Sequence, residues 1–188
     1  MINKKVLDYL KKNKIGFAVI DHKQIFTAHD LAQTLKEDFQ KIAKTLLVKA
    51  DKQYLIVVIP AYYRLDFKKL KKVLNVKKVE IPSEKIMEKV LKVKVGGITP
   101  FGALHKLETL VDKSLLKTQE TIMNAGSFTQ SLRLKVKDFI KLENVKLGSF
   151  VEKAGYKLAK SGKVTKKVTK KNNKKPGGSG SCLAWKRK

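Results

Sequence analysis

The order of apolar patterns along this chain predicts an α/β fold, with a single mixed-sheet domain, surrounding helices and a basic tail. Short β-branched runs alternate with segments whose apolar residues recur every three or four positions, which is typical of strands alternating with helices. The last acidic residue is Glu152, and the chain beyond it is rich in Lys, Gly, Ser and Asn. Such a segment buries too little apolar surface to offset its conformational entropy. We therefore expect a folded domain over residues 1–154 and a disordered lysine-rich tail over 155–188.

The first half of the domain is expected to run helix, strand, helix and hairpin. Thr27, with Asp30 three residues later, is typical of a helix N-terminus, because the hydroxyl can accept a free N–H group there. Residues 50–53 separate two β-rich runs and predict a turn between them. The expected elements are a helix carrying Val6, Leu7 and Leu10, a strand at 16–20, a helix with Leu31, Ala32 and Leu35 buried, and strands at 45–48 and 54–60.

The second half is expected to alternate in the same way. Asp66 and Ser83 each precede an amphipathic stretch and are predicted N-caps. The sheet is expected to be mixed, or antiparallel in part. The expected elements are a helix with Phe67, Leu70, Val73 and Leu74, a strand at 76–81, a helix with Ile86, Met87, Val90 and Leu91, strands at 109–111, 121–125 and 131–136, and a final helix at 136–142.

Charge and composition narrow the classes of partner and site. The chain carries 43 Lys and Arg against 16 Asp and Glu, a net charge of +27, which favours a polyanionic partner. Cys182 is the only cysteine, so neither an internal disulfide nor a cysteine zinc site is expected. His22, His29 and His105 lack metal-ligand spacing, and we expect no metal and no cofactor. Without a signal-like or membrane-spanning apolar run, a cytoplasmic location is expected and no membrane partner.

Two features could carry chemistry. The run 96–102 holds three glycines and Pro100, and a rigid loop of this kind exposes main-chain N–H groups that can bind an anion or a carbonyl oxygen. Lys44 opens an apolar strand. A lysine there is either a surface residue at the strand's edge or a functional cation, donor or base held at a pocket.

These features occur in an order that resembles a known family. The order is Ala43-Lys44-Thr45-Leu46, then an apolar strand ending in Pro60-Ala61, then Arg64-Leu65-Asp66, the glycine loop at 96–102 and Asn124-Ala125-Gly126-Ser127. Over roughly residues 1–145 the chain is similar to the YbaK/ProXp family of free-standing aminoacyl-tRNA deacylases, and to the editing domain inserted in bacterial prolyl-tRNA synthetases. The resemblance implies a metal-independent hydrolysis of a mischarged tRNA, assisted by the free hydroxyl of its 3′-terminal adenosine.

The resemblance also assigns roles to residues. The residues expected to act in catalysis are Lys44, Gly96, Gly97 and Pro100. The residues expected to bind the substrate around them are His22, Ile98, Thr99, Phe101, Gly102, Gly126 and Ser127. Basic side chains are expected to hold the RNA through counterion release, namely Lys68 and Lys69, and in the tail Lys163, Lys166, Lys167, Lys170, Lys171, Lys174 and Lys175.

The first functional hypothesis is therefore a deacylase that acts in trans on a mischarged tRNA, with Ala- or Cys-tRNA(Pro) as the expected substrate. The expected partners are the aminoacylated tRNA 3′ end and, as a further partner to consider, prolyl-tRNA synthetase. The alternative is a basic RNA-binding module that keeps the editing-domain fold without activity. A third interpretation, a nucleoid or membrane-surface protein, would depend on the tail. Loss of the aminoacyl ester separates the first from the others.

Overall fold

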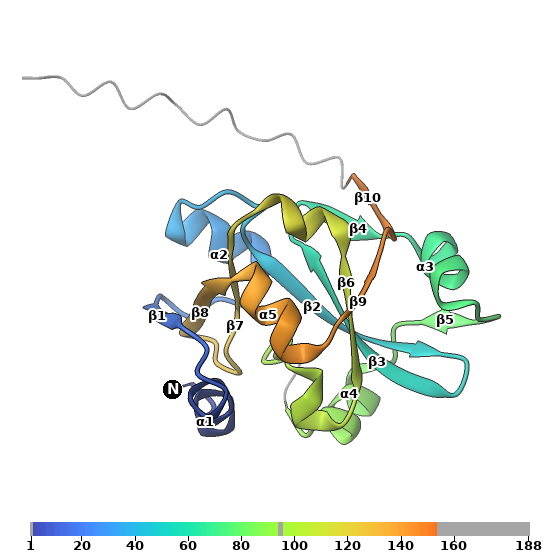
Figure 1. Ribbon diagram of the computed structural model, residues 1–188, viewed down its shortest axis with the longest axis horizontal. Coiled ribbons are helices and arrows are strands. Elements are labelled where there is room, and N and C mark those ends of the chain that lie inside the picture. Colours follow the sequence, from blue (N-terminus) through green and yellow to red (C-terminus); the bar gives the residue numbers. More distant parts are fainter. Residues whose placement is uncertain (1, 94–95, 154–188) are drawn as a thin grey trace, which may run out of the picture. The chain divides into compact units, whose positions relative to one another are not determined.

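The computed structural model describes residues 2–93 and 96–153 (Figure 1). Its helices within that part are α1 (Lys4–Lys12), α2 (Ala28–Leu35), α3 (Phe67–Leu74), α4 (Glu84–Leu91) and α5 (Val136–Glu143), with short 3-10 helices at Gly102–His105 and Lys113–Lys117. Its strands are β1 (Phe17–Asp21), β2 (Ala43–Ala50), β3 (Gln53–Pro60), β4 (Tyr63–Leu65), β5 (Val79–Glu80), β6 (Glu108–Asp112), β7 (Glu120–Asn124), β8 (Gln130–Lys135), β9 (Lys146–Gly148) and β10 (Val151–Lys153). The expected tail, residues 155–188, lies outside the described residues.

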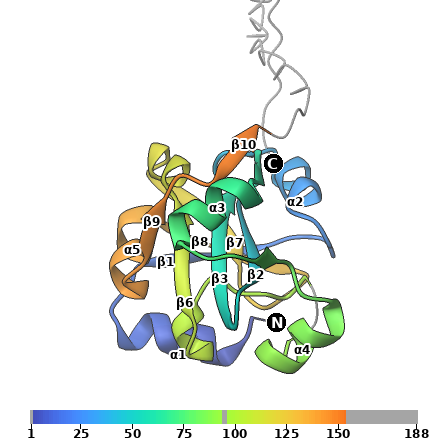
Figure 2. The same cartoon turned by 90° about the vertical axis from the view of Figure 1, so that its right-hand side faces the viewer.

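The strands form a mixed sheet with two smaller sheets beside it. The main sheet has the order β5-β2-β3-β6-β9, in which the β2–β3 and β2–β5 pairs are antiparallel and the β3–β6 and β6–β9 pairs are parallel. A three-stranded antiparallel sheet, β1-β8-β7, lies beside it (Figures 1 and 2). An isolated parallel bridge between Ile42 and Ile122 links the two. The predicted α/β class with a mixed sheet is confirmed.

The predicted N-cap residues lie at the N-termini of three helices, and two of them form the expected capping hydrogen bonds. The Thr27 hydroxyl accepts the Asp30 N–H at 3.1 Å, and one Asp66 oxygen accepts the N–H groups of Lys68 and Lys69. Ser83 holds the predicted N-cap position of α4, although its side chain makes no capping hydrogen bond. The predicted strand at 76–81 is only two residues long.

The shortening of that strand has a visible cause in the hairpin turn. The carboxylate of Asp51 accepts the N–H groups of Lys77 and Lys78, at 3.4 and 2.8 Å. The N–H of Val76 is bonded to the carbonyl of Lys71 at the end of α3. Residues 76–78 therefore connect α3 to the turn and do not extend β5 along β2.

Strand β3 is buried on both faces because its side chains alternate between two cores. Ile56 and Val58 face a core shared with α1, α4, α5 and the three-stranded sheet. Leu55, Val57 and Ile59 face a second core under α3. A third, smaller cluster fixes α2 through Leu31 and Ala32 against Ile42, Ala61 and Ile122. These three clusters hold the elements around the β2 edge in fixed positions.

A partly buried carboxylate ties α5 to the segment that follows the glycine loop. Glu143 Oε2 accepts the N–H of Ala103 at 3.1 Å and the hydroxyl of Thr109 at 3.2 Å. The second oxygen, Oε1, is buried without a hydrogen-bond partner among the described residues. Burial raises the pKa of Glu143, and the interactions with the Ala103 N–H and with the hydroxyls of Tyr9 and Thr109 offset only part of that effect. Glu143 therefore holds its proton to higher pH in the folded protein than in the unfolded chain.

Replacing Glu143 with Gln should make stability less dependent on pH. Because its pKa is raised, native Glu143 binds more protons than the unfolded chain, so its contribution to the free energy of unfolding falls as pH rises above the ordinary carboxyl range. The Glu143→Gln variant keeps an acceptor oxygen but does not titrate. Urea unfolding between about pH 4 and about pH 8 should show the variant gaining stability relative to the wild type as pH rises. The exposed Glu88→Gln variant is the control, and an equal pH trend in both variants would contradict the assignment.

Candidate active site

A pocket of about 200 Å³ opens beside β2, and it is lined by residues from six separate segments. The walls come from the loop before α2 with α2 itself, from β2, from the region of α4, from the glycine loop, from the end of β7 with the turn after it, and from β8. Among the lining residues are Leu31, Lys44, Met87, Gly96, Ile98 and Ser127. Lys44 and two residues of the glycine loop, Gly96 and Ile98, therefore line the same cavity.

Lys44 brings a partly desolvated ammonium to this cavity. It is the second residue of β2, opposite Ile59 in the β2–β3 register. No described Asp or Glu forms an ion pair with it. Burial lowers the pKa of Lys44, and the nearby positive charge of Arg64 lowers it further. A cation without a carboxylate partner in a partly buried site favours an anionic ligand such as a phosphate.

The open edge of β2 adds main-chain polar groups to the same cavity. Ala50 and Gln53 close a two-residue turn, so the paired residues that exchange hydrogen bonds with β3 alternate from Ala50 downwards. Thr45 and Leu47 occupy the other positions, where N–H and C=O groups point away from β3. On that side β5 pairs only with Lys49 and Ala50. Thr45 and Leu47 both line the pocket, so their backbone donors and acceptors face it.

The glycine loop needs Gly96 for two reasons. Its φ of +89° lies in the left-handed region, and a Cβ there would be only 2.7 Å from Cε1 of Phe128. Gly126 in the turn after β7 has a φ of +77°, and the space beside it is filled by Asn3 and Thr99 rather than by the pocket. Any side chain at either position would be strained.

Asn124 joins these two glycines. Its Nδ2 donates to the carbonyl of Gly96 at 2.6 Å, and its Oδ1 accepts the N–H of Gly126 at 2.6 Å. The side chain also lines the pocket. Sequence reasoning missed this residue, although an Asn that accepts the N–H two residues later is a common turn device. The position of the loop carbonyl at the pocket therefore depends on one amide.

The rest of the glycine loop supports the site from behind. Gly97, Thr99 and Pro100 are buried and do not line the pocket. Phe101, expected to bind substrate, is 0% exposed and packs edge-on against Tyr9 and Phe139 in the core. Gly102, expected in the same role, also lies in the interior, where a Cβ would meet the Thr109 hydroxyl at 2.4 Å. The structure places both residues in the packing beneath the loop because the chain turns inward after Ile98.

Of the remaining predicted substrate residues, Ser127 lines the pocket and His22 lies one contact behind it. Ser127 Oγ accepts the N–H of Thr129 at 3.2 Å. His22 Nδ1 lies 2.8 Å from the carbonyl of Lys23, so this nitrogen carries the proton. Its Nε2 lies 2.9 Å from the hydroxyl of Ser131, which does line the pocket. His22 thus orients a hydroxyl at the cavity.

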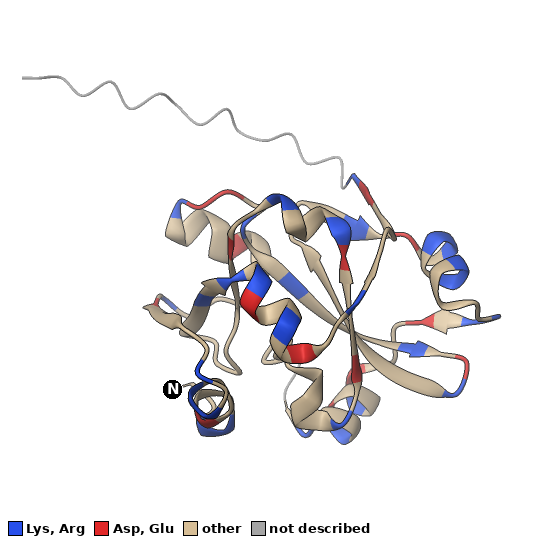
Figure 3. Ribbon diagram, in the orientation of Figure 1, with Lys and Arg blue, Asp and Glu red and all other residues tan. Residues whose placement is uncertain are grey.

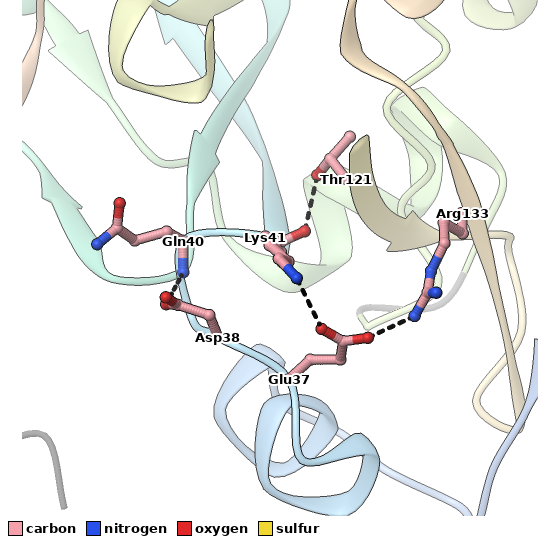
Figure 4. A network of polar contacts seen from close by, with 6 residues as sticks. All are labelled: Glu37, Asp38, Gln40, Lys41, Thr121 and Arg133. Carbon is pink, nitrogen blue, oxygen red and sulfur yellow. Dashed lines mark hydrogen bonds and ion pairs between the residues drawn. The ribbon is translucent and has the colours of Figure 1, made fainter. Parts of the chain in front are cut away.

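A network of polar contacts anchors the segment that leads from α2 into β2 (Figure 4). Glu37 pairs with Arg133 of β8 at 2.5 Å and with Lys41 at 3.4 Å. The carbonyl of Lys41 accepts the Thr121 hydroxyl at 3.0 Å and the N–H of Ile122 at 2.7 Å. These contacts fix the start of β2, and therefore Lys44, against the three-stranded sheet.

The two predicted RNA-binding lysines of α3, Lys68 and Lys69, lie away from the pocket lining. Half of the eight residues of α3 are lysines, and they colour much of the helix blue in Figure 3. Lys69 Nζ, however, is held by the carbonyl of Val151 at 3.1 Å and by Asp66 at 3.3 Å. Neither Lys68 nor Lys69 lines the pocket. The predicted tail lysines 163, 166, 167, 170, 171, 174 and 175 lie outside the described residues.

The described part of the chain contains no cluster of three or more His, Cys, Asp or Glu side chains arranged to hold a metal ion. None of its helices has the length and apolar character needed to cross a membrane.

Comparison with known proteins shows which family this chain resembles. A family model described as "Aminoacyl-tRNA editing domain" matches residues 22–142. The prolyl-tRNA editing protein ProX of Acetoanaerobium sticklandii is 25% identical over 143 residues, which cover 73% of this chain and 87% of that protein. A candidate Cys-tRNA(Pro)/Cys-tRNA(Cys) deacylase of Enterococcus faecalis, EbsC, is 30% identical over 127 residues, which cover 67% of this chain and 76% of EbsC.

A solved structure shows the same fold. The crystal structure of a candidate trans-editing enzyme for prolyl-tRNA synthetase matches with a TM-score of 0.71 at 18% identity, and the match covers 81% of this chain and 99% of that one. The matched family segment, 22–142, includes Lys44, the glycine loop and Asn124. The resemblance stated from the sequence is confirmed.

Replacing Asn124 with Asp should loosen the glycine loop. The variant keeps the acceptor for Gly126 but sets a carboxylate oxygen against the Gly96 carbonyl, so we expect a loss of about 1–3 kcal/mol in the free energy of unfolding. The loss should shrink at low pH, where the protonated acid can donate to that carbonyl again. Hydrogen exchange of residues 96–102 and urea unfolding measure both effects. The control is Asn13→Asp, which removes an exposed amide bond to the Tyr9 carbonyl, and equal effects at both positions would contradict the role of Asn124.

Proposed function

This chain belongs to the aminoacyl-tRNA editing domain family, and on that basis we propose that it is a trans-acting deacylase that hydrolyses the ester of a mischarged tRNA. The observation that carries the proposal is the shared cavity, which is lined by Lys44, by the glycine loop and by an open strand edge, and in which no described carboxylate pairs with Lys44. A 3′-aminoacyl end offers a phosphate, an ester carbonyl and an α-ammonium. The cavity offers a cation, main-chain donors and main-chain acceptors for them.

In the proposed reaction, main-chain groups provide most of the contacts to the reacting ester, and Lys44 is the one side chain assigned a direct role. Lys44 binds the terminal phosphate or ribose, and main-chain N–H groups at the pocket stabilise the negative charge that develops on the ester carbonyl oxygen. Main-chain carbonyls of the β2 edge accept the α-ammonium. A water oxygen attacks the carbonyl carbon, the bond to the ribose oxygen breaks, and that oxygen takes a proton, with the neighbouring ribose hydroxyl orienting the water. Fixing these groups in one cavity lowers the barrier by positioning.

The pocket's size and lining favour a small amino acid. Apolar side chains from α2, β2 and the glycine loop form its walls, among them Ala28, Leu31, Leu47 and Ile98. We propose Ala- or Cys-tRNA(Pro) as the substrate; of these two, Cys-tRNA(Pro) also occurs in the name of the relative EbsC. A difference of one methylene in such a pocket changes preference by only about 1–3 kcal/mol, so a panel of aminoacyl groups is needed to rank them.

A non-catalytic RNA-binding module is the second candidate, favoured by the net charge of +27. Such a module would need the basic surface for its affinity but has no use for a pocket with polar main-chain groups. It predicts RNA binding without loss of the aminoacyl ester.

Replacing Lys44 with Ala should lower kcat/KM for mischarged tRNA by about 10- to 150-fold, the equivalent of one charge-assisted hydrogen bond of about 1.5–3 kcal/mol. Release of the amino acid from Ala-tRNA(Pro) and Cys-tRNA(Pro), with correctly charged Pro-tRNA(Pro) alongside, measures this. Lys49→Ala is the matched control, because Lys49 lies on the same strand but pairs with Glu80 at 3.8 Å. Equal hydrolysis by wild type and Lys44→Ala would remove the role of Lys44. RNA binding by a wild type that hydrolyses none of the esters would favour the second candidate.

The pH profile tests the charge of Lys44 separately. Since the pKa of Lys44 is lowered, the ammonium is present at low pH and is lost earlier than an ordinary lysine as pH rises. After subtraction of spontaneous ester hydrolysis, kcat/KM should therefore fall on the alkaline side. In the Lys44→Arg variant this fall should move to higher pH, because a guanidinium does not lose its proton in this range. An unmoved alkaline limb would show that another group causes it.

A further inference from the structure

An aromatic side chain stands unusually exposed at the mouth of the pocket. Phe26 is 67% exposed, the highest value among the large hydrophobic side chains in the described part of the chain. It also lines the pocket. The exposure of a phenyl ring to water is unfavourable by burial energetics, and at the rim of a binding cavity it points to a ligand that covers it.

Phe26 is supported from behind by a second ring. The centroids of Phe26 and Phe128 are 5.6 Å apart, with an angle of 51° between the ring planes. The main chain fixes the two residues together, because the N–H of Ile25 donates to the carbonyl of Phe128 at 3.0 Å. Phe128 in turn packs on Gly96, where its ring occupies the space of a Cβ. The exposed ring is thus tied to the glycine loop by contacts and is held in place before any ligand arrives.

The surroundings indicate the chemistry of that ligand. Deep in the pocket lie Leu31, Leu47 and Ile98, which are buried and apolar. Lys44 supplies a cation that pairs with no carboxylate among the described residues. An apolar floor, a cation and an exposed aromatic face around one cavity match an aminoacyl group, a phosphate and a flat base, which are the three parts of an aminoacylated nucleotide.

Resting on the function proposed above, we propose that Phe26 is the stacking platform for the terminal nucleobase of the substrate's 3′ end. The order of the contacts supports the base rather than the amino acid as its ligand. The ester lies at Gly96, the amino-acid side chain points to the buried floor, and the base points outwards, where Phe26 begins one ring beyond Gly96. Aromatic side chains commonly bind unpaired bases in this way, with little dependence on which base is bound.

Kinetics on a mischarged acceptor-stem minihelix test the platform. Phe26→Ala should raise KM by about 5- to 100-fold, the range expected from the loss of one stacked base, with a smaller change in kcat. Phe26→Trp should restore KM, because it keeps an aromatic face. The matched control is Phe67→Ala, since Phe67 is also exposed but belongs to α3 and does not line the pocket. A wild-type KM in Phe26→Ala, or an equal rise in Phe67→Ala, would overturn the proposal.

A binding measurement keeps the test independent of catalysis. In a Trp185→Phe background, the indole introduced by Phe26→Trp reports contact with an uncharged minihelix through fluorescence quenching. Quenching should occur with a 3′ end of CCA and be largely lost when the last residue is abasic. Equal quenching by both RNAs, or none, would overturn the platform even if the wild type hydrolyses its ester. Base-dependent quenching in a protein without hydrolysis would keep the platform and remove the deacylase function.

Discussion

The site depends on a single asymmetry in strand pairing. β2 is bonded along its whole length to β3, but its other side is paired with β5 only at Lys49 and Ala50. The Asp51 carboxylate holds residues 77 and 78 at the turn, which keeps β5 short. The remaining edge would normally be a liability for a sheet, and here a loop, a helix and the glycine segment surround it. The pocket is the space that this arrangement leaves.

The walls of that space are fixed from several directions. The Glu37 network places the start of β2, while Asn124 places the glycine loop relative to the turn after β7. Phe101 anchors the far end of the same loop in the core. These anchors come from different elements, so the loop and the strand are positioned independently of the ligand. Such preorganisation is what electrostatic stabilisation of a developing charge requires.

Part of this was accessible from the sequence because some of its signals are local. Helix N-caps such as Thr27 and Asp66 depend on residues within one turn, whereas the roles expected of Lys44 and Gly96 came from the resemblance to the editing family. The short strands β4, β9 and β10 escaped because three-residue strands have no periodicity to detect. Asn124 and Phe26 escaped for a different reason. Their roles depend on partners 28 and more than 100 positions away, which no local pattern reveals.

The loop also shows how a correct motif can mislead about its members. The Gly-rich loop at 96–102 divides into two parts that have different roles. Gly96 and Ile98 reach the cavity. Phe101 instead packs against Tyr9 and Phe139, and Gly102 fits closely against Leu107 and Thr109. Proximity in sequence to a site residue is therefore a weak guide to contact with the substrate, because one bend in the backbone separates the two parts.

The strand edge has a consequence for how this fold can evolve. The peptide groups of Thr45 and Leu47 are present whatever side chains those positions carry. Amino-acid substitutions at these two positions therefore leave that part of the recognition surface intact. A shift of the β2–β3 register by one residue would not be tolerated in the same way. It would turn those peptide groups toward β3 and turn the peptide groups of their neighbours toward the pocket. Selection on this edge would then preserve alignment between strands more strictly than residue identity. Distant homologues could therefore catalyse the same reaction at low sequence identity.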